Sequence, residues 1–137
     1  MDENPPFVLM GGCFCGGVRY RSKTRPLNAL VCHCRTCQKT VGSAFNASIL
    51  FKDDAIELEG GIVYYSSSPI LERGHCGRCG SSVVARVRSR GWTMVTAGTL
   101  DDPAQFHADA HVWTCEKQPW LAISDGLPTF EQMSPKG

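Results

Sequence analysis

The sequence CGRCG, at residues 76–80, limits the possible fold classes of this chain more than any other stretch. Two cysteines separated by two residues and followed by glycine are typical of a zinc knuckle, because the tight turn directs both sulfurs at one metal ion and the glycine relieves backbone crowding. Two thiolates do not complete a tetrahedral zinc site. Cys76 and Cys79 therefore require two further ligands from another part of the chain.

The other cysteines also occur in groups. Seven of the eight cysteines form a CxC pair (Cys13 and Cys15, in GGCFCGG), a three-cysteine cluster (Cys32, Cys34 and Cys37, in VCHCRTCQKT) and the CxxC pair (Cys76 and Cys79). The N-terminal sequence MDENPPFVLMGG has two acids, two prolines and only a short apolar run, unlike a signal peptide. In a reducing cytoplasm, such tight groups indicate metal ligands rather than disulfides. We therefore expect a soluble, cytoplasmic, metal-binding protein.

The length and composition predict one globular domain over residues 1–137. Hydrophobic residues make up 42% of the chain and charged residues 20%, which permits a core and argues against disorder. No segment approaches the ~20 apolar residues of a membrane-spanning helix. The formal net charge of +1 gives no support for nucleic acid or an anionic membrane as a partner.

Short strands are predicted along the whole chain, because glycine and proline recur at short intervals and no long segment has a helical period. β-branched and aromatic residues with partial alternation predict strands at residues 17–22, 27–31, 44–51, 55–60, 62–67, 82–88, 92–100 and 107–113. Helical turns are expected only at residues 36–41 and 103–106. The pattern predicts a mainly β domain of antiparallel sheets.

Two partitions of the cysteines fit the ligand spacing of zinc. In the first, the CxC pair joins the CxxC pair in a closed site, and the three-cysteine cluster keeps an open position. In the second, Cys34 and Cys37 join the CxxC pair as a zinc ribbon, which leaves Cys13, Cys15 and Cys32 over. The spacing favours the first partition because it leaves no paired ligands unused.

The order of these motifs resembles that of the glutathione-dependent formaldehyde-activating enzyme family, which includes centromere-protein-V-like domains. The matching stretches are GGCFCGGVRY, CHCRTCQKTVGSAF, HCGRCGSSV, GTLDDP and HVWTCEKQPWLAISDGLPTFEQ, so the resemblance covers residues 11–132. It implies an Mss4-like fold of coiled antiparallel sheets with zinc knuckles.

The resemblance also implies two zinc ions per chain. A structural zinc would be held by Cys13, Cys15, Cys76 and Cys79. A catalytic zinc with an open position would be held by Cys32, Cys34 and Cys37, and we expect it to be the more labile of the two. His75 departs from the family, in which an aromatic residue often precedes the last CxxC. We interpret His75 as a polar side chain packing beside the knuckle, with a role as replacement ligand as the alternative.

The implied activity is that of an S-(hydroxymethyl)glutathione synthase, a carbon–sulfur lyase in which glutathione binds through its sulfur and the thiolate adds to formaldehyde. Three protein ligands with an exchangeable position are typical of catalytic zinc. Three thiolates make zinc a weak Lewis acid but favour a soft fourth ligand such as a thiol. Two other classes stay open. One is a zinc enzyme acting on another small carbonyl or thiol adduct, and the other is a thiol-binding or interaction module without catalysis.

The remaining candidate ligands are interpreted as structural. We expect Cys115 to be a buried or half-buried thiol. His33 should point away from the metal that its two neighbours share and lie either beside these ligands, without binding the metal, or at the surface. His107 and His111 lie four residues apart in a predicted strand, so they should share one face of it.

Overall fold

The computed structural model describes residues 8–133 and arranges their strands in two sheets. The strands are β1 (Met10–Gly12), β2 (Val18–Ser22), β3 (Asn28–Cys32), β4 (Asn46–Lys52), β5 (Ile56–Gly60), β6 (Ile62–Ser66), β7 (Glu72–Cys76), β8 (Ser82–Val87), β9 (Trp92–Thr96) and β10 (Ala110–Val112). The helices are α1 (Arg35–Val41) and the short 3-10 turns η1 (Asp53–Ala55), η2 (Arg88–Arg90), η3 (Ala97–Thr99), η4 (Pro103–Gln105) and η5 (Thr114–Glu116). Residues 1–7, part of the stretch used above to argue against a signal peptide, lie outside this range.

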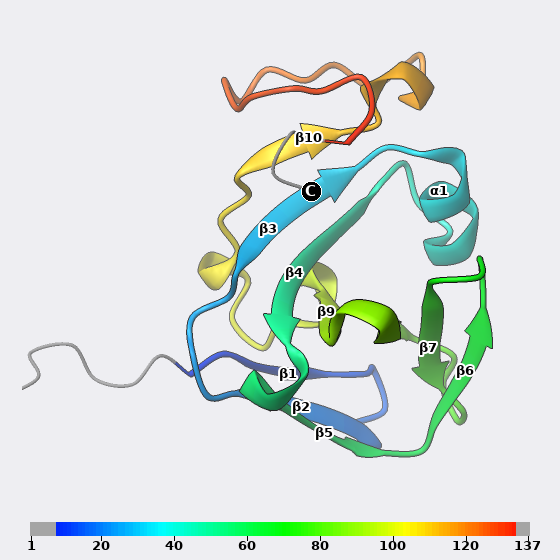
Figure 1. The fold of residues 1–137 in the computed structure, drawn as a ribbon, viewed down its shortest axis with the longest axis vertical. Helices are drawn as coiled ribbons and strands as arrows, with labels where there is room; N and C mark the ends of the chain where they lie inside the picture. Colours follow the sequence, from blue (N-terminus) through cyan, green and yellow to red (C-terminus); the bar gives the residue numbers. More distant parts are fainter. Residues whose placement is uncertain (1–7, 134–137) are drawn as a thin grey trace, which may run out of the picture.

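The small sheet has the order β1-β2-β5, and the large sheet has the order β10-β3-β4-β9-β8-β7-β6. Figure 1 shows β3 and β4 as long curved strands, with the small sheet below them and the segment after β10 above. The expected mainly β fold with antiparallel sheets is confirmed. One pair departs from it, because residues 97–109 carry the chain from β9 to the far edge, where β10 lies parallel to β3. Within the described residues, no helix is long and apolar enough to cross a membrane.

The predicted strands differ from the structure at two glycine-containing segments. Neither β1 nor β7 is predicted, because glycine lowers the strand propensity of a segment. In β7, Gly74 is required by close packing, since a Cβ at this position would lie 2.6 Å from Cγ1 of Val84. The strand predicted at residues 107–113 begins only at Ala110. His107 therefore lies in an exposed loop, and the expectation that it shares a strand face with His111 is wrong.

The hydrophobic core contains side chains from both sheets. Val18 and Tyr20 come from the small sheet, and Ile49, Phe51 and Val95 come from the large sheet. One cysteine of the CxC pair and one of the CxxC pair are also buried members of this core. The place where these two pairs meet is therefore continuous with the packing that holds the two sheets together.

Candidate metal centres

The CxC pair and the CxxC pair come together in space, although more than sixty residues separate them in sequence. Their sulfurs lie within 4.8 Å of one another, and the structure defines this four-cysteine cluster as Cys13, Cys15, Cys76 and Cys79. The sulfur of Cys15 is 3.5 Å from that of Cys13 and 3.7 Å from that of Cys76. Zinc–sulfur bonds of about 2.3 Å place the sulfurs of a tetrahedral site about 3.8 Å apart. The structure thus forms the first partition of the cysteines and not the zinc ribbon.

Backbone amides surround the sulfurs of the four-cysteine cluster. The amides of Gly17 and Val18 donate to Cys15 and Cys13, over 3.4 and 3.2 Å. The amides of residues 78 and 79 donate to the sulfur of Cys76 over 3.3 and 3.4 Å. Glycines with positive φ, at positions 16 and 80, allow the two loops to turn back in this way. Such donors favour thiolates, which are the form that binds a metal.

Hydrogen bonding shifts the pKa values of two sulfurs of this cluster in opposite directions. Hydrogen bonds from the hydroxyl and amide of Ser81 lower the pKa of the Cys79 thiol to about 5. For Cys15, the amide of Gly17 favours the thiolate, but hydrogen bonding to Cys13 and loss of solvent raise the pKa to about 11. Binding a metal ion at the cluster would replace the remaining protons.

The three-cysteine cluster lies where β3 ends and α1 begins. Cys32 is the last residue of the strand, and Cys34 is the N-cap of the helix, whose sulfur accepts a hydrogen bond from the amide of Cys37 over 3.3 Å. The three sulfurs lie within 4.8 Å of one another. Cys37 is buried, whereas Cys32 and Cys34 are partly exposed. The strand end and the helix start therefore present three ligands that can hold one metal ion with a further position open.

A buried arginine that the sequence analysis did not identify contacts this cluster. Nη2 of Arg73, on β7, lies 3.7 Å from the sulfur of Cys37. Hydrogen bonds from Cys32, then Cys34 and Arg73, lower the pKa of the Cys37 thiol to about 5, against the effect of burial. The pKa of Cys32 is raised, because its thiol donates to Cys37 and is buried. In the sequence, the only indication that Arg73 could lie near a metal centre is its position three residues before the CxxC pair.

His33 is fully buried. The expectation allowed a place either beside the metal ligands or at the surface, and the surface alternative is wrong. Its Nε2 lies 2.8 Å from Nδ1 of His111, and Nε2 of His111 lies 2.7 Å from Oδ2 of Asp125. The ring of Phe45 also packs on it, with centroids 5.6 Å apart. Burial lowers the pKa of His33. The histidine is outside both cysteine clusters, as expected, and it joins β3 to β10 and the segment that follows.

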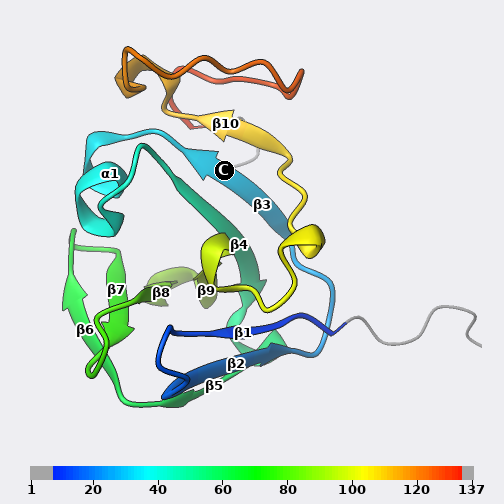
Figure 2. The same cartoon turned by 180° about the vertical axis from the view of Figure 1, so that it is seen from behind.

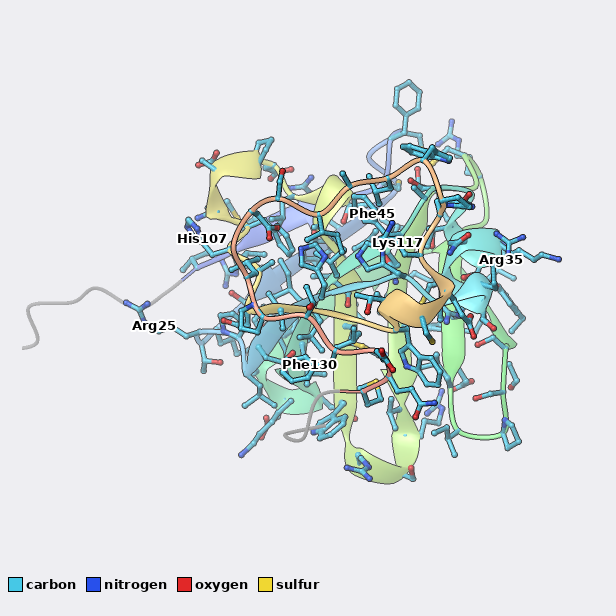
Figure 3. All side chains as sticks on the ribbon, turned by 90° about the horizontal axis from the view of Figure 1, so that it is seen from above. Arg25, Arg35, Phe45, His107, Lys117 and Phe130 are labelled. Atoms are coloured by element: carbon cyan, nitrogen blue, oxygen red, sulfur yellow. The ribbon has the colours of Figure 1, made fainter. Side chains whose placement is uncertain are left out.

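The segment after β10 covers the start of α1. Nε2 of Gln38 donates to the carbonyl oxygens of His33 and Glu116 over 2.6 and 2.9 Å. The carboxylate of Glu116 accepts the amide proton of Arg35 over 2.7 Å. Figure 3, seen from above, shows this segment with Lys117 and Phe130 running across the end of the molecule. These contacts hold the backbone around the three-cysteine cluster in place.

The two other candidate ligands lie outside both clusters. Cys115 is exposed on η5, so the expectation of a buried or half-buried thiol is wrong, because η5 is a surface turn. His75 is half-buried on β7, with its ring centroid 6.4 Å from that of Tyr65. His75 therefore packs beside the knuckle, as interpreted from the sequence.

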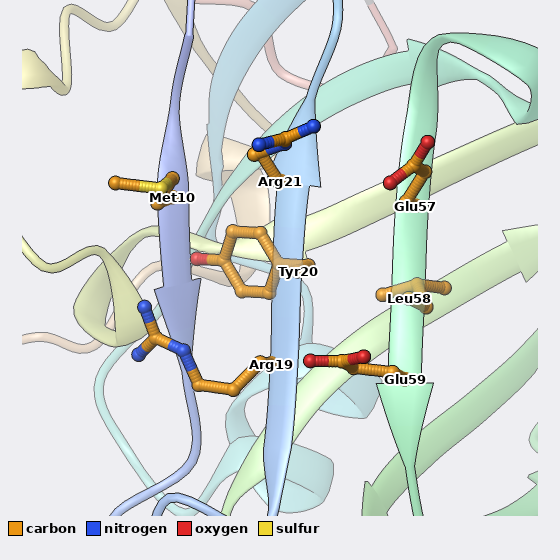
Figure 4. Close-up of a pocket in the computed structure, with 7 residues that line it drawn as sticks. All are labelled: Met10, Arg19, Tyr20, Arg21, Glu57, Leu58 and Glu59. Atoms are coloured by element: carbon orange, nitrogen blue, oxygen red, sulfur yellow. The ribbon is translucent and has the colours of Figure 1, made fainter.

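Two hollows on the described surface contain no cysteine. One lies on the small sheet and is lined by Met10, Arg19, Tyr20, Arg21, Glu57, Leu58 and Glu59 (Figure 4). Its charges are largely balanced, and Arg19 already forms an ion pair of 2.5 Å with Asp101. The other is lined only by residues of the segment after β10 and includes Lys117, whose Nζ donates to the carbonyl oxygens of Gln118 and Leu121. We assign no chemistry to either hollow.

The fold and the two clusters define a mainly β domain with two cysteine centres able to hold metal ions. The model of the family described as glutathione-dependent formaldehyde-activating enzyme matches residues 8–116, which is most of the chain, so the chain belongs to this family. Its structure is similar to the crystal structure of a Rhodobacter sphaeroides protein, with a TM-score of 0.54 and 17% sequence identity over 88% of this chain and 98% of the other. That likeness shows the fold alone. A comparison with curated proteins gave no match.

Proposed function

We propose that the chain is a zinc-dependent enzyme of the S-(hydroxymethyl)glutathione synthase type, which joins the sulfur of glutathione to formaldehyde. The observation that carries this proposal is that the second cluster gathers three cysteine sulfurs and not four. Cys115 and His75, which could have supplied an eighth ligand, lie outside it. Family membership supports the same activity.

The two clusters have different roles in this proposal. The four-cysteine cluster holds a structural zinc, because four protein ligands close the tetrahedral site. Zinc held by Cys32, Cys34 and Cys37 would take the sulfur of a thiol as its fourth ligand and stabilise it as a thiolate. Cys32 and Cys34 keep partial solvent exposure, which gives a small thiol access to the open position.

The reaction requires little beyond thiol activation and positioning. The glutathione thiol releases its proton to water as its sulfur is held as a thiolate. The sulfur then forms a bond to the carbonyl carbon of formaldehyde, and the π electrons of the carbonyl move to its oxygen. That oxygen takes one proton back from water, so the reaction consumes no net proton. The protein contributes by holding the thiolate at the end of β3, where the hydrogen bonds of Gln38 to His33 and Glu116 fix the backbone. Fixing one reactant in this way lowers the entropic part of the barrier.

The activity is tested by following S-(hydroxymethyl)glutathione formation by NMR after mixing dilute glutathione and formaldehyde. The zinc-loaded protein is expected to bring the mixture to equilibrium at least about 100-fold faster than buffer alone, which is the lower end of the range typical of catalysis by positioned proton-transfer groups. The Arg86→Met protein serves as a matched active control, since Arg86 stacks on Tyr64 and contacts neither cluster. A rate equal to the buffer rate would remove this activity from the protein.

A second candidate is a thiol-binding module without catalysis. The observation that favours it is that the hollow on the small sheet and the hollow in the C-terminal segment contain no cysteine, so neither of them adjoins the three-cysteine cluster as a pocket for the rest of a glutathione molecule. The two candidates differ in one result. Both predict that thiols bind at the cluster, but only the enzyme accelerates the addition to formaldehyde.

A further inference from the structure

Arg73 is a buried cation at the edge of the three-cysteine cluster. The residue is only 7% exposed, and its guanidinium donates to the sulfur of Cys37 through Nη2 and to the hydroxyl of Ser67 through Nε, over 3.7 and 2.9 Å. Figures 1 and 2 show, from opposite sides, that β7 lies beside α1, which carries Cys37. The contact therefore joins two elements that are far apart in sequence.

The burial of Arg73 requires a negative partner. A guanidinium removed from water is strongly destabilising unless an anion compensates its charge. Among residues 8–133, no carboxylate forms an ion pair with Arg73, and the neighbouring Glu72 pairs with Arg88 on the outside of the sheet. The anion within reach is the sulfur of Cys37. The position of Arg73 thus requires a cluster that carries negative charge.

The negative charge of the cluster also affects which ligand can occupy its open position. Zinc with three thiolates already carries net negative charge, and an anionic fourth ligand adds to it in a partly buried place where repulsion is weakly screened. In the four-cysteine cluster, hydrogen bonds from four backbone amides stabilise the negative charge of the sulfurs. At the three-cysteine cluster, a full positive charge lies against one of the ligands.

We propose that Arg73 is the specificity-determining residue of the three-cysteine site, which by its charge makes the open position favour an anionic ligand over a neutral one. The inference rests on the proposed function in that it takes this cluster to hold a metal ion. The ligand class it assigns is a soft anion, of which the thiolate of glutathione is one member. Lysine in place of Arg73 should preserve much of this preference, because the charge is retained.

The test uses the full chain with cobalt(II) in both sites, titrated with thiocyanate as a soft anionic probe and imidazole as a neutral one. Arg73→Met is expected to weaken thiocyanate binding tenfold or more, with imidazole affinity changed less than about threefold. The cobalt affinity of the same site should fall by about 10- to 100-fold in competition with a chelator, the range typical of lost outer contacts to a metal ligand. Arg73→Lys should stay close to the unmodified protein. Arg86→Met is the matched control, since it removes a positive charge from the neighbouring strand β8 without contacting a cysteine.

Several results would overturn the inference. An equal loss for both probes in Arg73→Met would show a packing role, and an equal loss of thiocyanate binding in Arg86→Met would show a general field effect. If Arg73→Met does not fold, Arg73→Lys decides, because a tenfold loss of thiocyanate preference in this folded, charged variant contradicts the role of charge. Failure of the proposed function can be told apart from these outcomes. In that case thiocyanate binding still depends on Arg73, but glutathione leaves the cobalt spectrum unchanged.

Discussion

Replacing Cys76 with serine is expected to unfold the domain. The side chain is 2% exposed, belongs to the hydrophobic core and accepts hydrogen bonds from two backbone amides. Structural zinc sites contribute about 10–16 kcal/mol to folding in small zinc-binding peptides, whereas a whole domain is stable by only about 5–15 kcal/mol. Loss of this metal should therefore remove most or all of the net stability. Circular dichroism and metal analysis of the purified variant measure both effects.

The matched control is Cys115→Ser, because Cys115 is an exposed thiol outside both clusters. This variant should fold and retain two metal ions per chain. A folded Cys76→Ser protein that still holds two metal ions would contradict the structural role of the four-cysteine cluster. Arg73 and Cys76 share β7, so partial disorder of the knuckle should also weaken the second metal site.

Replacing Cys34 with serine is expected to leave a folded protein that has lost one metal ion and its response to thiols. Cys34 is the N-cap of α1, and serine is among the best N-cap residues, so the substitution removes a ligand without removing the cap. The hydrogen bonds of Gln38 to His33 and Glu116 hold the surrounding backbone independently of the sulfur. The melting temperature should change by only a few degrees, which corresponds to about 1 kcal/mol. Metal content and thermal unfolding check these expectations.

The comparison of Cys34→Ser with Cys76→Ser separates the roles of the two clusters. If both variants unfold, the three-cysteine cluster is structural and its open position has no functional meaning. If Cys34→Ser keeps both metal ions and still accelerates formaldehyde addition, another residue supplies the ligand or the reaction occurs elsewhere.

Much of the fold could be predicted from local sequence. The β-branched and aromatic residues at 44–51 and 92–100 predict strands because their side chains fit a pleated, half-buried surface. The structure has strands there at Asn46–Lys52 and Trp92–Thr96, the second ending four residues earlier than predicted because a 3-10 turn follows it. By contrast, β7 contains glycine and glutamate, which are depleted in strands, and its pairing with β6 and β8 decides its conformation. The parallel pairing of β10 with β3 could not be predicted, because it depends on the path of a long connection.

The candidate site also has a part that the local sequence predicts and a part that it does not. Cysteine spacing along the chain was sufficient to group Cys32 with Cys34 and Cys37, since all three lie within six residues. The residues that modify this cluster come from distant segments. Arg73 reaches it from β7, and His111 reaches His33 from β10, so both contacts depend on sheet order and not on local pattern. For Arg73, the only sequence signal is its position three residues before the CxxC pair, and for the contact of His111 with His33 the local pattern gives none.

The most direct test of the central claim is a titration of the cobalt-substituted protein with glutathione, followed by absorption spectroscopy. We predict a new sulfur-to-cobalt charge-transfer band that saturates at one glutathione per chain, because the three-cysteine cluster has one position for a further sulfur. The same titration of Cys34→Ser should give no new band. A cobalt spectrum of the unmodified protein that glutathione leaves unchanged would contradict the claim that the open position binds a thiol.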